Sequence, residues 1–505
     1  MTNEAPKIKE KKYLFYVILL FFMVAVCYIF SWLISEHCLE YKLYFLVFDF
    51  VFNIIKKATI ISAIFFILYI IINCCVRGDI YIVLLRKKVI FFFSIIFILI
   101  ISINYFVGNL FFEEHVPNIV VCVIDSLRKD YVGVYSDNLD ESVTPNIDKF
   151  AKDALVFKNV YSTSSWTNPA IASFFTGLYP STHRVNWFED KDDGEQIEAD
   201  ALSSKFVTLA EVLKNNGYST AAYIANDWVC SELGFDQGFD IFESKVDFTA
   251  EDLIHKVKKW IMKNRKKRQF LYLHFVDVHE REGDDFSREQ YVANIKQIDK
   301  HIPKIINILK KEKLWENTVF ILTSDHGTHF NEEYNGTSHR TLFQKDIAIP
   351  LIMHLPDKKV QFYKVYQGKI WSLVDMMPMI ISFVCDYRVP YKIDGFYKEN
   401  YNHKSFVFAE LLTQTMTNMP QIAIIRNASK SIFYLIDQSV EHYILKNNAE
   451  YFNGNIKKQT SDKFFIFESF KERERQAEEI LSVKSEKNVL LHDKIKHLKS
   501  LGYLK

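Results

Sequence analysis

Asn118-Ile-Val-Val-Cys-Val-Ile-Asp125 is the stretch of sequence that decides the fold. Its apolar part is short, continuous and rich in β-branched residues, which is typical of a strand buried on both faces of a parallel sheet. Three further runs of this kind occur downstream, at residues 219–224, 270–276 and 318–323. Segments with helical periodicity lie between them, such as residues 208–216 before Gly217. The pattern predicts an α/β fold in which helices cover a parallel sheet.

Three of the predicted strands end in residues that can bind a metal ion or move a proton. Ligands of open α/β sheets bind beyond the carboxyl ends of the strands, so these side chains are expected to meet at one edge of the sheet. They are Asp125, the segment from His274 to His279, and Asp325 with His326. Three strand ends of this type indicate a metal or catalytic site more specifically than a single motif does.

Composition limits the class of protein. Lys and Arg number 62 against 61 Asp and Glu in 505 residues, so net charge gives no reason to expect a nucleic-acid partner. The seven cysteines show neither CxxC pairs nor zinc-finger spacing, which argues against a disulfide framework and against a thiolate metal site. Cys122 lies inside the first apolar run and is predicted to be a buried, unreactive core thiol.

The N-terminal part of the chain has the composition of a membrane region. Residues 13–34 form an apolar run long enough to cross a hydrocarbon core of about 30 Å, and residues 59–76 and 89–110 form two more. Basic residues precede the first run and separate the other two, at residues 77–88. The positive-inside rule leaves both basic segments in the cytoplasm. Three transmembrane helices are therefore predicted, and the residues after 110 are expected outside.

Two alternatives to this topology concern the same region. Residues 43–55 carry Asp49 and are short for a span, so an interfacial helix is favoured; a fourth span would leave either the N-terminus or the basic loop on the wrong side. A cleavable signal peptide is disfavoured by the length of the first run and the lack of a small-residue cleavage site. The predicted domains are a membrane region at residues 1–112, an α/β domain at 115–395 and a C-terminal subdomain at 396–505.

A series of short motifs follows in a fixed order along residues 115–505. It opens with residues 118–133, Thr144-Pro-Asn-Ile-Asp148 and residues 165–181. It continues with Thr208-Leu-Ala-Glu-Val-Leu, Asn216-Gly-Tyr-Ser-Thr-Ala-Ala, Thr323-Ser-Asp-His-Gly327, Ile349-Pro-Leu-Ile352, Val374-Asp-Met-Met-Pro378 and Leu498-Lys-Ser-Leu-Gly-Tyr-Leu504. The series resembles the sulfatase and alkaline-phosphatase superfamily, and its order makes it more specific than any one motif.

The resemblance implies both a fold and a metal site. The fold would be an alkaline-phosphatase-like three-layer α/β sandwich with a small C-terminal subdomain, preceded here by the helical transmembrane region. Asp125, Asp325, His326 and the nucleophile would hold one divalent ion. Two carboxylates, an imidazole and a hydroxyl favour Zn or Mn, with Mg or Ca as less favoured choices, and a second ion remains open.

Thr167 stands where the superfamily places its nucleophile. Sulfatases have Cys or Ser-x-Pro-x-Arg there and convert the Cys or Ser to formylglycine, whereas this chain reads Thr167-Asn-Pro-Ala-Ile171. Asp125-Ser126 also departs from the paired aspartates of sulfatases. A Thr nucleophile is similar to that of phosphoethanolamine transferases, lipoteichoic-acid synthases and nucleotide phosphodiesterases. Thr167 is also a candidate helix N-cap before Pro169, a role compatible with the chemistry.

Three histidines are further candidates. His274 and His279 flank Asp277, where the superfamily places substrate-binding or second-metal histidines, and His339 follows later. His279 and His339 are assigned to catalysis, as groups that hold phosphoryl oxygens or protonate the leaving oxygen. His274, Asp277 and Arg128 are assigned to substrate binding, and a role in the geometry of the site is the alternative for Arg128. A histidine beside an apolar strand is also often purely structural.

The sequence thus predicts an enzyme that transfers or hydrolyses a phosphoester-linked group through a phosphothreonine. Membrane lipids are the expected anchor and donor of phosphoethanolamine or phosphoglycerol, with a glycan or lipid acceptor; protein partners are not predicted. The expected location is the cytoplasmic membrane, multi-pass, with the catalytic domain on the extracytoplasmic side. A sulfatase, disfavoured by Thr167 and Ile171, and a non-catalytic membrane-bound member, disfavoured by the retained site residues, are the alternatives. Glu410 and Arg426 have family-like surroundings but no assigned role.

Overall fold

The computed structural model of the chain describes the following residues: 116–136, 142–191, 196–279, 287–330, 341–356, 364–384, 390–396, 405–412, 420–446, 449–455, 461–481 and 487–490. The predicted membrane region and His339 lie outside them, so the three predicted spans and their topology stay predictions. Among the described residues, no helix is both long enough and apolar enough to cross a bilayer. The described residues belong to one compact unit, His115–Lys505.

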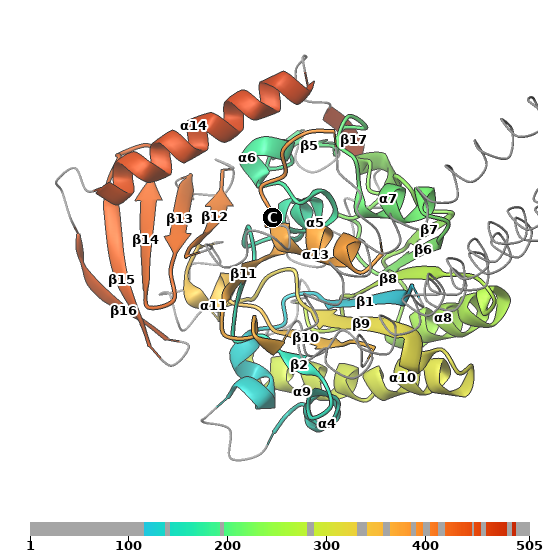
Figure 1. Cartoon of the computed structure of the whole chain (residues 1–505). Helices are drawn as coiled ribbons and strands as arrows, with labels where there is room; N and C mark the ends of the chain where they lie inside the picture. The colour runs from blue at the N-terminus through green and yellow to red at the C-terminus, as the bar shows by residue number, and fades with distance from the viewer. Residues whose placement is uncertain are drawn as a thin grey trace, which may run out of the picture. The chain divides into compact units, whose positions relative to one another are not determined.

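A seven-stranded sheet forms the centre of this unit, in the order β2-β10-β9-β1-β8-β6-β7 (Figure 1). Its strands are β1 (Asn118–Ile124), β2 (Leu155–Val156), β6 (Ser219–Ile224), β7 (Ile241–Ser244), β8 (Gln269–Phe275), β9 (Thr318–Thr323) and β10 (Leu351–His354). The strands from β9 to β7 are parallel, as predicted. β10 is antiparallel to both β9 and β2, so the prediction of a parallel sheet is wrong at this edge. Strand direction depends on tertiary pairing, which so short a run does not encode.

β1 is the central strand and pairs with β8 on one edge and β9 on the other. All of its residues are buried, which explains the continuous apolar run in the sequence. Cys122 is a free cysteine with no exposed surface, and burial raises the pKa of its thiol. The prediction of a buried core thiol is therefore confirmed.

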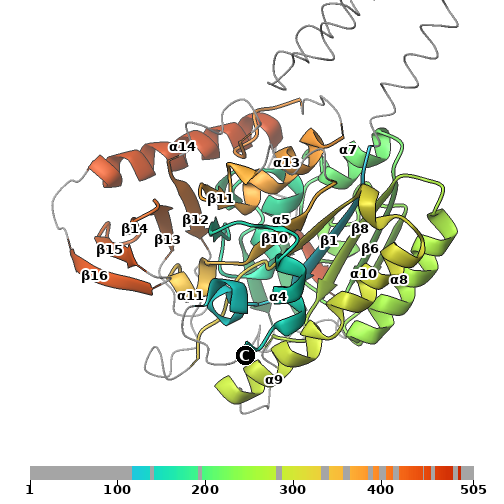
Figure 2. The same ribbon diagram turned by 60° about the horizontal axis from the view of Figure 1, so that its bottom comes forward.

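Helices cover both faces of the sheet, as Figures 1 and 2 show. One face carries α5 (Thr167–Thr176), α7 (Leu209–Asn215) and α13 (Met376–Ser382); the other carries α8 (Ala250–Asn264), α9 (Arg288–Asp299) and α10 (Ile302–Lys311). Capping boxes at Thr208 and Thr249 fix the starts of α7 and α8. This is the mixed α/β architecture that the sequence predicts.

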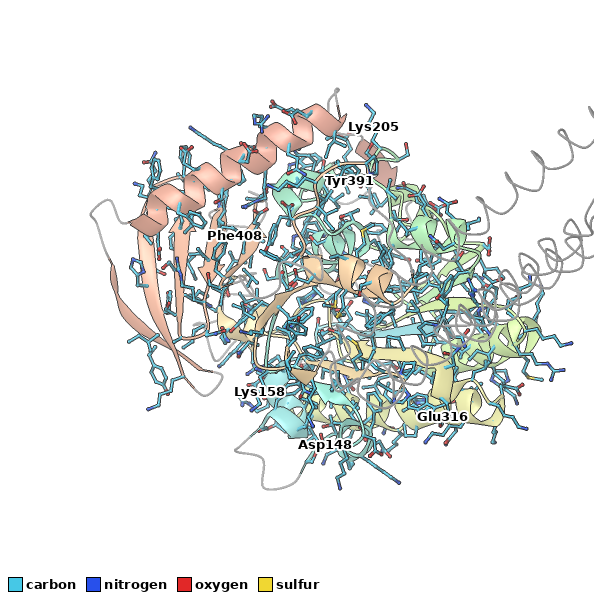
Figure 3. The ribbon with its side chains drawn as sticks, in the orientation of Figure 1. Asp148, Lys158, Lys205, Glu316, Tyr391 and Phe408 are labelled. Atoms are coloured by element: carbon cyan, nitrogen blue, oxygen red, sulfur yellow. The ribbon has the colours of Figure 1, made fainter. Side chains whose placement is uncertain are left out.

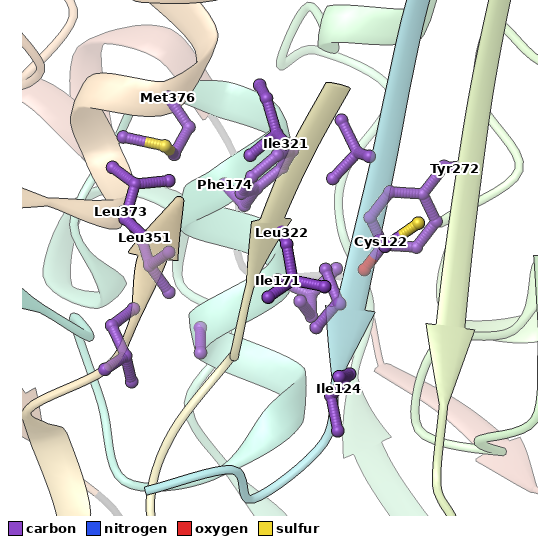
Figure 4. Packing of buried hydrophobic residues seen from close by; sticks show 14 of the residues in the cluster. Cys122, Ile124, Ile171, Phe174, Tyr272, Ile321, Leu322, Leu351, Leu373 and Met376 are labelled. Atoms are coloured by element: carbon purple, nitrogen blue, oxygen red, sulfur yellow. The ribbon is translucent and has the colours of Figure 1, made fainter. Parts of the chain in front are cut away.

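The helix that starts with Thr167 is enclosed by the core. All residues of α5 are buried. Figure 4 shows Ile171 and Phe174 of α5 among core side chains of β1 and β9. The helix ends at Gly177, whose φ of +70° is the left-handed conformation that glycine adopts without steric cost. Packing on all sides therefore fixes the position of the first turn of α5.

A second sheet lies toward the C-terminus and is antiparallel throughout. It consists of β12 (Val407–Leu411), β13 (Gln421–Ile425), β14 (Ser429–Tyr434), β15 (Val440–Lys446) and β16 (Ala449–Asn455). The long helix α14 (Ser461–Leu481) runs along it (Figure 1). Phe408 of β12, labelled in Figure 3, stacks on Phe465 of α14 with ring centroids 6.1 Å apart. Aromatic packing thus joins this sheet to α14.

Shorter elements complete the described part of the chain. They are α4 (Pro145–Ala151), β3 (Asn159–Tyr161), α6 (Pro180–His183), β4 (Phe188–Lys191), β5 (Gln196–Asp200), α11 (Gln344–Ile347), β11 (Ile370–Ser372) and β17 (Lys487–Leu490), with 3₁₀ turns η1 (Lys129–Tyr131), η2 (Gly133–Tyr135), η3 (Ser231–Leu233), η4 (Trp315–Asn317) and η6 (Leu373–Asp375).

A buried ion pair ties α14 to β12, and hydrogen bonds extend the link to α6, which follows α5. Arg473 Nη2 donates to Glu410 Oε1 at 2.5 Å, and Arg473 Nε donates to Ser181 Oγ at 2.9 Å. The same Glu410 accepts the backbone N–H of Ser181 at 2.7 Å. The side chain of Glu410 has no exposed surface and that of Arg473 is 7% exposed. Glu410, which has no role in the sequence analysis, is thus a structural link between β12, α6 and α14.

Arg473→Ala is expected to lower the free energy of unfolding by about 3–5 kcal/mol, because it leaves the Glu410 carboxylate buried without its counter-ion. Arg475→Ala is the matched control on the same helix: its exposed pairs with Glu472 and Glu479 lie in solvent, so little change is expected. Chemical denaturation of both variants measures the difference. Equal denaturation midpoints for the two variants would contradict the inference that the Arg473–Glu410 ion pair stabilises the fold.

Candidate active site

The candidate site lies at the carboxyl edge of β1, β8 and β9. In the register of the sheet, Val123 pairs with His274 of β8 and with Thr323 of β9. Asp125 and Asp325 come two residues after these pairs on β1 and β9, so they and His274 reach the same edge. The expectation that these strand ends meet is therefore correct for these side chains.

Asp325 and His326 are held by their own loop and by the end of β1. Asp325 Oδ1 accepts the backbone N–H groups of Ser126 at 3.2 Å and of His326 at 2.8 Å. His326 Nδ1 lies 2.6 Å from the carbonyl oxygen of Gly327. A carbonyl only accepts, so Nδ1 carries a proton, and in the neutral ring the lone pair is left on Nε2. The imidazole is thus arranged as a metal ligand.

Asp125 is fully buried, and both of its oxygens are engaged. Ser126 Oγ donates to Oδ1 at 2.8 Å, and Asn226 Nδ2 donates to Oδ2 at 2.6 Å. Burial favours a higher pKa for this carboxyl, but the imidazoles of His279, His274 and His326 outweigh burial and hold the pKa well below its usual range. Asp125 is therefore an anion at neutral pH, as a metal ligand must be.

Ser126 adopts the left-handed conformation with φ of +60°. A non-glycine residue pays a steric penalty there, and such residues occur often at functional sites. The turn at Ser126 directs its N–H to Asp325 and its hydroxyl to Asp125. The residue that replaces the second aspartate of sulfatases thus links the two carboxylates.

Thr167 is the first residue of α5, and its hydroxyl lies within this group. Oγ1 lies 3.4 Å from Asp125 Oδ2, to which it donates, and 3.3 Å from His326 Nε2. The N-cap is Trp166, which makes no side-chain cap bond. The prediction that Thr167 caps the helix is therefore wrong, because Thr167 already has helical geometry and its hydroxyl is directed to the site.

The residues present fit a divalent cation. Among the described residues, Asp125, Asp325 and His326 form a buried group whose ligand atoms all lie within 4.8 Å of one another. Asp325 Oδ2 is buried and has no hydrogen-bond partner in the described part of the chain. An unpartnered buried carboxylate oxygen is costly unless a cation faces it. These three residues, with the Thr167 hydroxyl beside them, could therefore hold one divalent ion.

The other predicted site residues are placed differently. His279 is buried next to the group, with its ring centroid 6.3 Å from that of His326. Asp277 is half-buried in the turn after β8. The Arg128 guanidinium pairs with Asp130 at 2.6 Å, which supports its alternative role in the geometry of the site. The positions of His279 and Asp277 leave their predicted roles untested.

Asn226 is a site residue that the sequence analysis missed. Besides its bond to Asp125, its Oδ1 accepts the backbone N–H of Trp228 at 2.8 Å, which fixes the amide orientation. Asn226 follows the end of β6 by two residues. The rule that directed attention to polar residues after β1, β8 and β9 applies equally to this strand and could have found it.

Comparisons with known proteins show what the chain is similar to. A family model described as Sulfatase matches residues 117–386. The ulvan-active sulfatase of Formosa agariphila is 22% identical over 334 residues, which cover 53% of this chain and 52% of that protein. The bis(5'-adenosyl)-triphosphatase of Homo sapiens is 26% identical over 227 residues, covering 42% and 47%.

Solved structures extend the similarity to the fold. The lipoteichoic acid synthase LtaP from Listeria monocytogenes superposes with a TM-score of 0.52 at 16% identity, covering 73% of this chain and 93% of that chain. The chain spans about half the length of the curated relatives it matches.

Proposed function

Since this chain belongs to the sulfatase family, whose model matches residues 117–386, we propose that it is a metal-dependent enzyme that transfers or hydrolyses a phosphoester through a phosphothreonine at Thr167. The observation that carries the proposal is the position of the Thr167 hydroxyl, 3.4 Å from Asp125 Oδ2 and 3.3 Å from His326 Nε2. A hydroxyl is a weak nucleophile near neutral pH and needs such a setting to react. Thr167 stands where sulfatases carry the Cys or Ser that becomes formylglycine.

The proposed reaction has two balanced halves. Thr167 Oγ1 forms a bond to phosphorus while the bond from phosphorus to the leaving oxygen breaks, and in net terms the Thr167 proton ends on that oxygen. His279, buried beside His326, is the candidate carrier of this proton. In the second half, an alcohol or water attacks phosphorus, the bond to Oγ1 breaks, and Thr167 regains a proton. When bound, the divalent ion would supply charge stabilisation for the phosphoryl oxygens and favour the ionised hydroxyl.

The proposed donor is a membrane phospholipid, with transfer of phosphoethanolamine or phosphoglycerol to a glycan or lipid acceptor. The apolar runs at residues 13–34, 59–76 and 89–110 support this choice, because an anchor raises the local concentration of a lipid substrate. The same anchor suits a hydrolase of lipid phosphoesters. The acceptor therefore distinguishes transferase from hydrolase.

A phosphodiester substrate screen tests the proposal. Purified full-length protein with Zn²⁺ or Mn²⁺ is expected to cleave bis-p-nitrophenyl phosphate and to release diacylglycerol from phospholipid vesicles, and a chelator is expected to stop both reactions. Mass spectrometry of protein trapped with donor should find the added group on Thr167. Turnover of p-nitrophenyl sulfate without phosphoester turnover would overturn the proposal.

That outcome would instead favour the second candidate, hydrolysis of a sulfuric ester. The family match and the similarity to the ulvan-active sulfatase favour it. Against it stand Thr167 and Ile171 in place of the formylglycine precursor and the arginine of sulfatases. The two candidates share the metal site and differ in the anion that it receives.

The topology prediction is that residues from about 115 onward lie outside the cytoplasmic membrane, because the basic segments before residue 13 and after residue 76 are retained inside. An alkaline phosphatase reporter joined after residue 120 is expected to be active, and a green fluorescent protein reporter joined at the same point is expected to be dark. The opposite pair of results would show that residues 43–55 cross the membrane and that the predicted localisation is inverted.

A further inference from the structure

His274 is a buried histidine that the proposed reaction does not use. It lies near the end of β8 with no exposed surface. Its Nδ1 lies 3.1 Å from the Tyr272 hydroxyl. Its Nε2 is buried and, within the described residues, makes no hydrogen bond. Burying an imidazole nitrogen in this position is costly unless a hydrogen bond or a cation satisfies it.

Two carboxylates face this nitrogen. His274 Nε2 lies 3.4 Å from Asp125 Oδ2 and 3.8 Å from Asp325 Oδ2, the oxygen that also has no hydrogen-bond partner among the described residues. His326 Nε2 approaches the same two carboxylates from another direction, at 3.6 Å from each. His274 Nε2 therefore lies on the Oδ2 side of Asp125 and His326 Nε2 on its Oδ1 side, and both nitrogens lie near Asp325 Oδ2.

His274 Nε2 lies at the edge of the group formed by Asp125, Asp325 and His326, at distances close to those of donors around a common ion. Donor atoms that hold a tetrahedral Zn²⁺ at about 2.0–2.2 Å lie about 3.3–3.6 Å from one another. The contacts of Thr167 Oγ1 with Asp125 and His326 are 3.4 and 3.3 Å, and those of the two imidazoles are 3.4–3.8 Å. These values are long for hydrogen bonds, whose usual range is about 2.7–3.2 Å, and suit side chains that share a cation.

We propose that His274 binds the divalent cation directly through Nε2, as a second imidazole ligand beside His326, rather than contacting substrate as the sequence predicted. The inference rests on the metal site of the proposed function. Tyr272 is the positioning residue in this proposal: its hydroxyl oxygen accepts a hydrogen bond from Nδ1–H, which leaves the lone pair on Nε2. Two imidazoles with two carboxylates select Zn²⁺, Mn²⁺ or Co²⁺ over Mg²⁺ and Ca²⁺.

The competing arrangement has the proton of His274 on Nε2, directed at Asp125, with no contact to the metal. X-ray absorption of the Zn²⁺-loaded, full-length wild-type protein separates the two arrangements without any substitution. Two histidine ligands per zinc are expected. One histidine ligand, that of His326, overturns the proposal.

Variants provide an independent measurement. His274→Gln is expected to weaken Zn²⁺ at least about 100-fold in competition with a chromophoric chelator and to shift the visible spectrum of the Co²⁺-loaded protein. Tyr272→Phe, which removes only the positioning hydroxyl, is expected to weaken Zn²⁺ about 10-fold. Unchanged affinity and an unchanged Co²⁺ spectrum in His274→Gln overturn the proposal.

His183→Gln is the matched control. His183 is also buried, but both ring nitrogens are engaged: Nε2 lies 3.0 Å from Ser173 Oγ, and Nδ1 accepts the Val185 N–H at 3.1 Å. This variant is expected to melt earlier with and without Zn²⁺, by the same amount. His274→Gln should instead lose most of the Zn²⁺-induced rise in melting temperature. None of these readouts involves turnover, so a protein inactive on phosphoesters can still confirm this ligand, and an active one can still refute it.

Discussion

Thr167→Ala is expected to lower phosphoester turnover by at least about 10³-fold while the metal stays bound, because the variant removes the attacking oxygen and leaves both carboxylates and the imidazole in place. Thr167→Ser keeps a hydroxyl and is expected to retain part of the activity. Steady-state kinetics together with metal analysis of the purified variants measures both effects.

Thr176→Ala is the matched control for this experiment. Thr176 is also a buried threonine of α5, but its hydroxyl donates to the Ala172 carbonyl at 2.7 Å and lies at the other end of the helix. Loss of the Thr176 hydroxyl is expected to affect the stability of the protein and not phosphoester turnover. Near-normal turnover in Thr167→Ala, or a covalent adduct on another residue, would remove the case for a phosphothreonine enzyme.

Asp325→Ala, like His326→Ala, is expected to release the metal and abolish activity while leaving the fold largely intact. These groups stand on the loop after β9 rather than in the apolar core. The loss of metal affinity should exceed the about 10- to 100-fold that substitution of an outer-shell residue causes, because a direct ligand is lost. Isothermal titration with Zn²⁺ and elemental analysis provide the measurement.

Thermal unfolding of the Asp325→Asn variant provides a further test of Asp325 as a metal ligand. Without metal, this variant is expected to melt no earlier than wild type, because it removes one of two carboxylates that lie close together in the interior. With Zn²⁺, the rise in melting temperature seen for wild type should be absent. Asp375→Asn is the control: Asp375 accepts the N–H groups of Ser372 and Phe396 and is expected to lose stability while keeping the Zn²⁺ response. An equal Zn²⁺-induced rise in melting temperature in Asp325→Asn and wild type would show that Asp325 is not a metal ligand.

The sequence predicted the parts of the fold that local pattern encodes. The strands β1, β6 and β9 agree with the predicted ranges, and β8 is shifted by one residue, because continuous β-branched runs report burial on both faces. The capping box at Thr208 likewise marks the start of α7. The antiparallel direction of β10 and the ion pair of Arg473 with Glu410 were not predictable, since both depend on contacts between residues far apart in the chain.

The sequence likewise predicted some residues of the candidate site and not others. Asp125, Thr167, Asp325 and His326 stand in motifs, and the structure brings them together. Asn226 belongs to no quoted motif and is defined by its bond to Asp125, a contact that only the sheet order creates. The geometric distinction between His274, which faces the carboxylates, and Asp277, which follows in the turn, also requires the side-chain directions of the folded strand.

The central place of β1 has a consequence for how the protein is made. β1 ends at residue 124, but its partners β8 and β9 begin at residues 269 and 318. A ribosome that adds about 5–20 residues per second needs about 7–30 s to reach β8 and about 10–40 s to reach β9. Until β8 is made, the buried, apolar β1 has neither of its neighbours, and such a segment is prone to aggregate. Nascent chains that stall before residue 318 should therefore depend on chaperones more than chains that stall after residue 330.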